Sequence, residues 1–171
     1  SPHVRCGVST KNLMYDVAIA MLPATIWGVM QFGIYSLIVV VATVLSCVLS
    51  EYLFETLMHK PVTISDGSAL VTGMILGLNM PPAIPLWMPI LGGVFAIIVV
   101  KQLYGGLGQN WMNPALAARC FMLISFAQAM TKFTDPVTDA VASATPLAAI
   151  KAGDTYDLAA MFIGKIPGTI G

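Results

Sequence analysis

A polar stretch near the C-terminal end places hydroxyl and carboxylate groups together in an otherwise apolar chain. Asp139 precedes Ser143, Ala144 and Thr145, and Pro146 follows them. Threonine and proline suit the N-cap and first-turn positions of a helix, so capping alone accounts for the Thr145 hydroxyl. The residue types therefore leave two interpretations open, a helix cap and a hydroxyl group with a chemical role.

A second polar group, Asp66, Gly67 and Ser68, stands directly before an apolar run. Asp66 and Ser68 are of the types that cap helices, which explains them without any further function. Alternatively, the free N–H groups at the start of a short membrane helix bind an anion or the polar edge of a cofactor. A half-helix at membrane depth occurs only where it is buried in protein or lines a cavity. The segment is therefore also a candidate lining for a pore or a cofactor site.

Arg119 lies about two turns into the last strongly apolar segment. An arginine within a membrane is costly without a partner, so it predicts a functional contact. An ion pair with a carboxylate of another helix and a contact with a phosphate group explain it equally well. The glycines upstream, at 105, 106 and 108, do not form the GxGxxG pattern of a soluble dinucleotide-binding fold. They indicate tight backbone turns or a close approach to a ligand.

Three carboxylates, Asp16, Glu51 and Glu55, lie near the ends of apolar segments. At such positions a charged group can reach water, so we expect them to be interfacial anchors. The alternative is that one of them lies on a path for ions.

The composition indicates that the chain lies in a lipid bilayer. Hydrophobic residues make up 57% of the chain and charged residues 9%, whereas about a quarter of a typical soluble domain is charged. The net charge is zero and no block of like charge occurs, which argues against a nucleic-acid partner. Cys47 and Cys120 fall inside apolar runs without CxxC spacing, so we interpret them as small hydrophobic residues rather than ligands of an iron cluster.

Five apolar segments predict an all-α polytopic bundle. They run from about Asp16 to Met30, Ile34 to Phe54, Ser68 to Met80, Trp87 to Val100, and Asn113 to Met130. The third is short for a bilayer with roughly 30 Å of hydrocarbon. Ser9 or Asn12 is the expected cap of the first helix, and Asn113 with Pro114 the expected start of the fifth. Trp87 and Tyr104 are expected to be interfacial aromatic residues.

The distribution of lysine and arginine predicts the orientation. Arg5, Lys11, Lys60 and Lys101 all fall on one side if every segment crosses the membrane, which places the N-terminus in the cytoplasm. The loop with Lys132 and Thr145 then lies on the outer face. The expected organisation is a cytoplasmic segment (1–15), a membrane bundle (16–130) and an outer-face loop (131–171) leading to a second half beyond this chain.

Several long motifs resemble one family. They are SPHVR (1–5), STKNLMYDVAIAMLPA (9–24), DGSALVTGMILGLNMPP (66–82) and GGLGQNWMNPALAAR (105–119). Together they resemble the D subunit of the Rnf complex and the related B subunit of the sodium-pumping NADH:quinone oxidoreductase. The stretch from Asp139 through Ser143, Ala144 and Thr145 to Leu147 is similar to this family's flavin-attachment motif, Dxx(S/T/A)(S/G)ATxL.

This resemblance implies a cofactor and partners. In the family motif, the threonine hydroxyl is esterified to the phosphate of FMN, so Thr145 is the expected attachment point, and Asp139 is expected to serve the modifying reaction. Arg119 and the group Asp66, Gly67 and Ser68 become candidate flavin contacts, and riboflavin is a further candidate cofactor. The implied partners are the lipid bilayer, a flavin transferase and other membrane subunits of the Rnf complex, including a second flavin-bearing subunit.

The sequence therefore predicts a redox-driven ion translocase subunit in the cytoplasmic membrane of a bacterium or archaeon. The resemblance implies that it relays electrons in a ferredoxin:NAD oxidoreductase and that its fold is the first of two repeated bundles like those of urea and ammonium channels. The alternatives are one half of a non-redox channel or transporter, with the short third helix and the glycine-rich loop as the pore, and a purely structural subunit.

Overall fold

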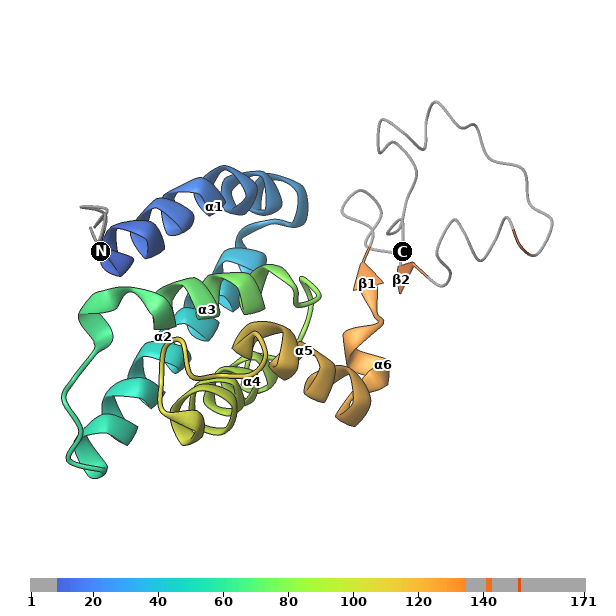
Figure 1. Cartoon of the computed structure of the whole chain (residues 1–171). Coiled ribbons are helices and arrows are strands. Elements are labelled where there is room, and N and C mark those ends of the chain that lie inside the picture. Colours follow the sequence, from blue (N-terminus) through green and yellow to red (C-terminus); the bar gives the residue numbers. More distant parts are fainter. Residues whose placement is uncertain (1–8, 135–140, 143–150, 152–171) are drawn as a thin grey trace.

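The fold is described from a computed structural model of the chain, which describes residues 9–134, 141–142 and 151. Figure 1 shows a helical bundle coloured along the sequence. Asp139, Ser143, Ala144 and Thr145 lie outside the described residues, so the predicted attachment motif stays a prediction.

All five predicted apolar segments are helical. In chain order the elements are α1 (Thr10–Phe32), α2 (Ile34–Leu57), a 3-10 turn η1 (Ile64–Asp66), α3 (Ser68–Leu78), α4 (Trp87–Val94), a π-helix η2 (Phe95–Lys101), a 3-10 turn η3 (Gln102–Tyr104), α5 (Pro114–Ser125) and α6 (Ala127–Met130). Besides helices, the described part contains one antiparallel pair of two-residue strands, β1 (Phe133–Thr134) and β2 (Val141–Ala142), with Phe133 opposite Ala142. The prediction of an all-α polytopic membrane protein is confirmed.

Within the described residues, three helical stretches are long and apolar enough to cross a membrane: Thr10–Phe32, Ile34–Leu57 and Trp87–Tyr104. The helices Ser68–Leu78 and Pro114–Ser125 are shorter. The third segment is short, as predicted, but the fifth is shorter than expected. At Phe126 the backbone leaves the helical region (φ −133°, ψ 48°), which ends α5 and starts the single turn α6.

The ends of the long helices follow their capping residues. Ser9 accepts a hydrogen bond from the backbone N–H of Lys11 at 3.3 Å, so Ser9, rather than Asn12, caps α1. Asn113 accepts hydrogen bonds from two N–H groups at the start of α5, and Pro114 occupies the first turn. Both features satisfy donors that a helix start leaves free.

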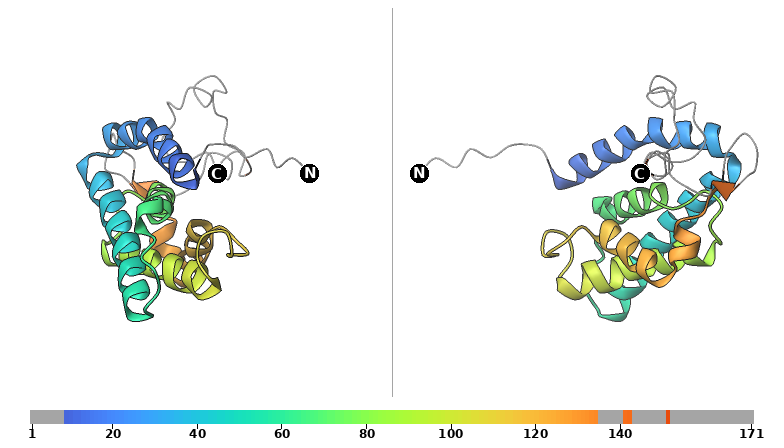
Figure 2. Two further views of the ribbon diagram at one scale, coloured as in Figure 1. Left: turned by 60° about the vertical axis from the view of Figure 1, so that its left-hand side comes forward. Right: turned by 90° about the vertical axis from the view of Figure 1, so that its right-hand side faces the viewer.

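Close backbone contact joins α2 and α3, which cross near the middle of the bundle (Figure 2). A Cβ added at Gly73 would lie 2.6 Å from the Cα of Val44, and one at Gly77 would lie 2.9 Å from the Cα of Val40. Membrane helices are held largely by van der Waals packing, and small residues allow the backbones to approach. The two glycines therefore fix the position of α3, most of whose residues are buried.

The α4–η2 segment packs between α2 and α5. Ser46 of α2 donates a hydrogen bond to the carbonyl of Ile90 at 2.8 Å. On the other side, the rings of Phe95 and Phe121 stack with centroids 4.2 Å apart, and Trp87 meets Phe126 edge to face at 5.2 Å. These pairs show that α5 runs antiparallel to α4–η2, whereas α2 runs parallel to it.

The contacts define two ends of the bundle. At the proximal end, α1 and α3 begin and α2 and η2 finish, because Gly67 contacts Tyr15 and Lys101 contacts both Glu51 and Ser68. The start of α5 lies at the same end, because Trp111, just before it, meets Tyr104 at the end of η3. At the distal end lie the loop after α3 and the start of α4, which meets Phe126. The chain therefore leaves α5 and α6 at the end opposite to that where α1 begins.

The packing at Gly73 yields a prediction. We expect Gly73→Ala to lower the free energy of unfolding by about 1–3 kcal/mol, because the added methyl group meets the backbone of Val44. Gly28→Ala is the matched control, since a Cβ there has nothing within 4 Å. Thermal unfolding of the purified full-length protein in detergent measures both. Equal midpoints for the two variants would contradict the close packing of α2 on α3.

Candidate functional site

A cluster of buried polar side chains lies at the proximal end. The Nζ atom of Lys101 lies 2.6 Å from Oε1 of Glu51, and this is the ion pair found within the described residues. Lys101 also donates a hydrogen bond to Oγ of Ser68 at 2.6 Å. The side chains of Glu51 and Lys101 are 0% and 2% exposed. A pair that is this deeply buried depends on its geometry and on its hydrogen bonds.

Gln102 and Thr63 complete this charge cluster. The amide nitrogen of Gln102 donates to Oε1 of Glu51 at 3.0 Å and to Oε1 of Glu55 at 3.1 Å. The backbone N–H of Thr63 donates to Oε2 of Glu55 at 2.9 Å, and the Thr63 hydroxyl bonds the same carboxylate. Glu51 and Glu55 are one helical turn apart, so both project from one face of α2. Thr63 itself is exposed and lies between the buried carboxylates and the surface.

The group Asp66, Gly67 and Ser68 forms a helix start. Oδ1 of Asp66 accepts from both the backbone N–H and the hydroxyl of Ser68, at 2.8 and 2.5 Å. Gly67 adopts the left-handed region (φ 77°), which suits a residue without a Cβ. Gly67 occupies the N-cap position without a side-chain bond, and Ser68 is already the first residue of α3, so the side chain that binds a free N–H group of the helix start is that of Asp66. Because Ser68 also accepts from Lys101, the α3 start is part of the charge cluster.

Three assignments made from the sequence are wrong here. Glu51 and Glu55 are buried rather than interfacial anchors, and Lys101 is buried rather than a cation of a loop. The reason is tertiary: the end of η2 and the start of η3 bring Lys101 and Gln102 against α2, where Lys101 pairs with Glu51 and Gln102 bonds both carboxylates. The orientation predicted from lysine and arginine therefore depends on Arg5, Lys11 and Lys60. Asp16, by contrast, is exposed on α1.

The charge cluster holds more acidic than basic side chains. Lys101 pairs with Glu51, Gln102 bonds both Glu51 and Glu55, and Asp66 lies at the edge through Ser68. Among the described residues, Oε2 of Glu51 is the buried side-chain atom without a hydrogen-bond partner. Buried polar groups are nearly always paired, so this oxygen calls for a physical explanation.

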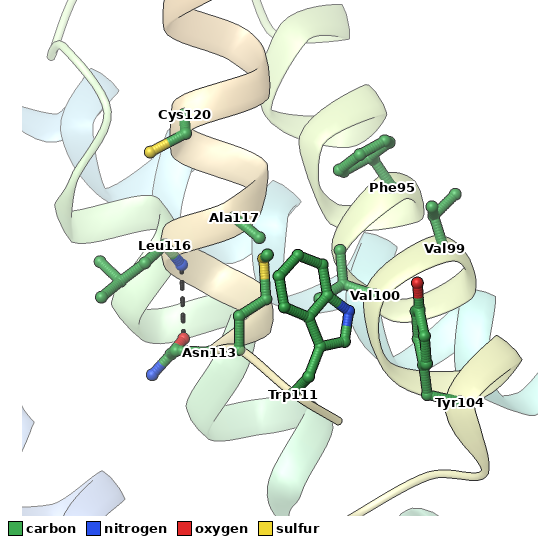
Figure 3. A pocket seen from close by; sticks show the side chains of 10 residues that line it. Phe95, Val99, Val100, Tyr104, Trp111, Asn113, Leu116, Ala117 and Cys120 are labelled. Carbon is green, nitrogen blue, oxygen red and sulfur yellow. Dashed lines mark hydrogen bonds between the residues drawn. The ribbon is translucent and has the colours of Figure 1, made fainter. Parts of the chain in front are cut away.

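An aromatic pocket lies beside the charge cluster, between η2 and α5. Figure 3 shows the rings of Trp111 and Tyr104 beside a hollow. Phe95, at the start of η2, also lines it. The cavity has a volume of about 500 Å³. Trp111 and Tyr104 are 68% and 52% exposed, so a bound ring would remove large apolar surfaces from solvent. Asn113, whose side-chain oxygen caps α5, supplies a polar group at the rim.

The glycine-rich loop shapes this pocket. Gly105, Gly106 and Gly108 all have positive φ (113°, 98° and 84°). A residue with a Cβ would be strained at each position, so the prediction of tight backbone turns is confirmed. The turns bring Trp111 to within 6.2 Å of Tyr104, measured between ring centroids.

Arg119 lies away from the pocket, toward the distal end. Its Nη1 atom donates to the side-chain oxygen of Asn79 at 3.1 Å, and Asn79 in turn donates to the carbonyl of Ile75. The arginine is exposed and its partner within the described residues is an amide rather than a carboxylate. Its charge is thus available to an anion.

The two cysteines of the apolar segments differ. Cys47 is buried, as predicted for a small hydrophobic residue, but Cys120 is exposed and lines the aromatic pocket.

Sequence reasoning found the α3 start and the glycine turns, but it missed the charge cluster, the pocket and the bond between Arg119 and Asn79. The spacing of Glu51 and Glu55 at i and i+4 could have indicated a shared face. The partnership with Lys101 had no local signal, because the two residues are 50 positions apart.

The bundle and its buried charges are those of a polytopic α-helical membrane protein. A model of the NQR2, RnfD, RnfE family matches residues 1–171. The chain therefore belongs to this family.

Curated relatives are similar over nearly the whole chain, and each is named as the D subunit of an oxidoreductase complex. That of the Na(+)-translocating ferredoxin:NAD(+) oxidoreductase complex of Acetobacterium woodii is 46% identical over 171 residues, covering 99% of this chain and 51% of the relative. That of the proton-translocating ferredoxin:NAD(+) oxidoreductase complex of Clostridium ljungdahlii is 40% identical, covering 100% and 56%. That of the ion-translocating oxidoreductase complex of Shewanella denitrificans is 40% identical, covering 89% and 44%. This chain spans about half the length of these relatives.

The buried ion pair yields a prediction. We expect Lys101→Met to lower the free energy of unfolding by about 3–5 kcal/mol, because it leaves the buried carboxylate of Glu51 without its cation. The double variant Lys101→Met/Glu51→Leu should be less destabilised than Lys101→Met alone. Thermal unfolding of the full-length protein measures both.

Lys60→Met is the matched control, because Lys60 is exposed. A loss of stability in Lys60→Met equal to that in Lys101→Met would contradict a specific buried pair.

Proposed function

We propose that this protein is a membrane subunit of an ion-translocating ferredoxin:NAD oxidoreductase of the Rnf type, and that it carries FMN esterified to Thr145. Similarity to relatives named as D subunits of such complexes, over 99% of this chain, is the observation that carries the proposal. The attachment motif from Asp139 to Leu147 supports the cofactor assignment.

The bundle geometry supports a flavin at the distal end. The chain leaves α6 at the end opposite to the start of α1, so the segment toward Thr145 starts there. With the N-terminus in the cytoplasm, that end faces outward. Arg119 and Asn79 lie toward the same end and offer a guanidinium and an amide, groups that bind phosphate well. We therefore propose Arg119 as a contact of the FMN phosphate.

The aromatic pocket supports a second, noncovalent flavin. Ligand pockets are concave, mostly apolar and typically roughly 300–1,000 Å³, with a few polar groups that set orientation. The pocket has about 500 Å³, two exposed aromatic rings and Asn113 at its rim. These features suit the flat, amphipathic ring system of riboflavin. When bound, the flavin supplies the electron chemistry, and the protein supplies position and environment.

In this arrangement the two flavins lie toward opposite ends of one bundle, so the protein would relay electrons across part of the membrane. The charge cluster lies beside the pocket, on the side where cytoplasmic ions arrive. The relatives are named for transport of sodium in one case and protons in another. Asp66, Gly67 and Ser68 contribute to this function by holding the α3 start against Lys101.

The covalent flavin is tested by Thr145→Val. After denaturing electrophoresis under ultraviolet light, we expect a fluorescent band in the wild type, made in cells with an active flavin transferase, and none in the variant. Removal of the hydroxyl leaves no oxygen for the ester. Ser143→Ala, which changes a neighbouring hydroxyl, should keep the band. A dark wild-type band would refute the flavin carrier and favour a channel or scaffold.

The noncovalent flavin is tested by Trp111→Leu. We expect acid-released flavin to fall by about one equivalent per complex while the covalent fluorescent band stays, because the ring loses its stacking partner in the pocket. Trp27→Leu is the matched control, since Trp27 is 63% exposed on α1 and lies outside this pocket. Unchanged released flavin in Trp111→Leu would contradict the assignment.

A further inference from the structure

We infer that Asn79, at the end of α3, is a positioning residue that holds Arg119 of α5 ready to bind a singly charged phosphodiester. The physiological ligand rests on the proposed function, because FMN esterified to a threonine is such a phosphodiester. A phospholipid headgroup offers the same chemistry from the bilayer. In this arrangement Asn79 decides both the direction of the guanidinium group and the charge of the anion that it binds.

The side-chain amide of Asn79 has one orientation that suits its neighbours. Its Nδ2 atom donates to the carbonyl of Ile75 at 2.7 Å, and its Oδ1 atom accepts from Nη1 of Arg119 at 3.1 Å. A rotated amide would set oxygen against the Ile75 carbonyl and nitrogen against the guanidinium group, which pairs acceptor with acceptor and donor with donor. Asn79 caps the end of α3, where the last carbonyls lack partners within the helix. The helix end thus fixes the direction of the oxygen that holds Arg119.

The contact satisfies a donor of Arg119 without cancelling its charge. A guanidinium group has several N–H donors, and within the described residues Arg119 makes its hydrogen bond to a neutral amide. Arg119 is exposed, which leaves the remaining donors to a ligand. An arginine that served only the packing of a membrane bundle is expected beside a carboxylate, because that pair offsets the cost of its charge. The choice of an amide therefore points to an anion from elsewhere.

The carboxylates of the described residues lie in the proximal half of the bundle. They are found in the first two turns of α1, in the last two turns of α2 and just before α3: Asp16, Glu51, Glu55 and Asp66. Lys132, which follows α6, adds a second exposed cation on the distal side. Within residues 9–134 the distal half thus holds cations and no carboxylate. An anion that reaches this end is attracted to it.

The charge and shape of this group favour a phosphodiester. Arg119 retains one positive charge, and a phosphodiester carries one negative charge. The planar fork of a guanidinium group matches two oxygens of a phosphate group, which a lysine ammonium group does not. A carboxylate at position 79 would neutralise the guanidinium group and repel the same ligand. The amide of Asn79 therefore contributes specificity as well as orientation.

The test uses the whole complex, purified in a phosphorus-free detergent and carrying Thr145→Val so that no covalent flavin is present. The probe is dimethyl phosphate, a singly charged phosphodiester, and a phosphorus NMR titration follows its binding. We expect saturable binding that becomes about tenfold weaker when Asn79→Asp or Arg119→Gln is added, because each change removes a charge-assisted hydrogen bond to the probe. Asn12→Asp is the matched control, since it adds the same charge at an exposed residue near the start of α1.

A second measurement separates positioning from a purely structural role. Asn79→Asp places a carboxylate beside Arg119, so we expect the thermal unfolding midpoint of the full-length protein to stay or rise while binding of the probe weakens. A lower midpoint with unchanged binding would show that Asn79 serves only the fold and would overturn the inference. If Asn79→Asp does not assemble, Asn79→Ala must weaken binding several-fold, because the guanidinium group loses its orientation. Unchanged binding in Asn79→Ala would also overturn it.

Comparison with the complex that retains Thr145 identifies the source of the phosphodiester. If the flavin phosphate occupies the site, the probe binds to the Thr145→Val complex and not to the flavin-loaded one. Equal binding to both, weakened by Asn79→Asp, assigns the site to a phospholipid headgroup. If binding is absent or does not depend on Asn79 and Arg119 while the fluorescent flavin band persists, the inference fails and the proposed function stands.

Discussion

The arrangement at the proximal end depends on one constraint: inside a membrane, a polar group must find its partner within the protein. The pair of Lys101 and Glu51 meets this requirement across 50 residues of sequence, and Ser68 and Gln102 extend it to α3 and η3. Four elements are thereby fixed at one point. Removing any one of these groups would leave a buried charge or a buried donor without its partner.

This constraint also explains why α3 is short and central. Gly73 and Gly77 let its backbone lie against α2, which brings the start of α3 to the level of Glu51 and Lys101. A longer helix would carry the start of α3 past these groups. The close packing of α2 on α3 and the buried charges are thus two parts of one solution, in which small residues set the distance and polar residues set the register.

The sequence was sufficient for features that depend on local rules. Ser9 and the pair of Asn113 and Pro114 mark helix starts, and the glycine-rich loop marks tight turns, because capping and backbone freedom act over a few residues. It was insufficient for Glu51 and Lys101, since a charged residue at the end of an apolar run looks the same whether it reaches water or a partner. The end of α5 at Phe126 could not be predicted either, because no proline or glycine stands near it in the sequence.

The π-helix η2 links the two sites. Phe95 and Val99 line the aromatic pocket, whereas Lys101, at the end of the same segment, lies in the charge cluster. A π-helix places an extra residue in each turn compared with an α-helix, and such segments occur frequently at functional sites. Conversion of this segment toward α-helical geometry would rotate Lys101 relative to Val99. The aromatic pocket and the charge cluster are therefore joined by a few residues of backbone, so the geometry of this one segment sets the positions of both.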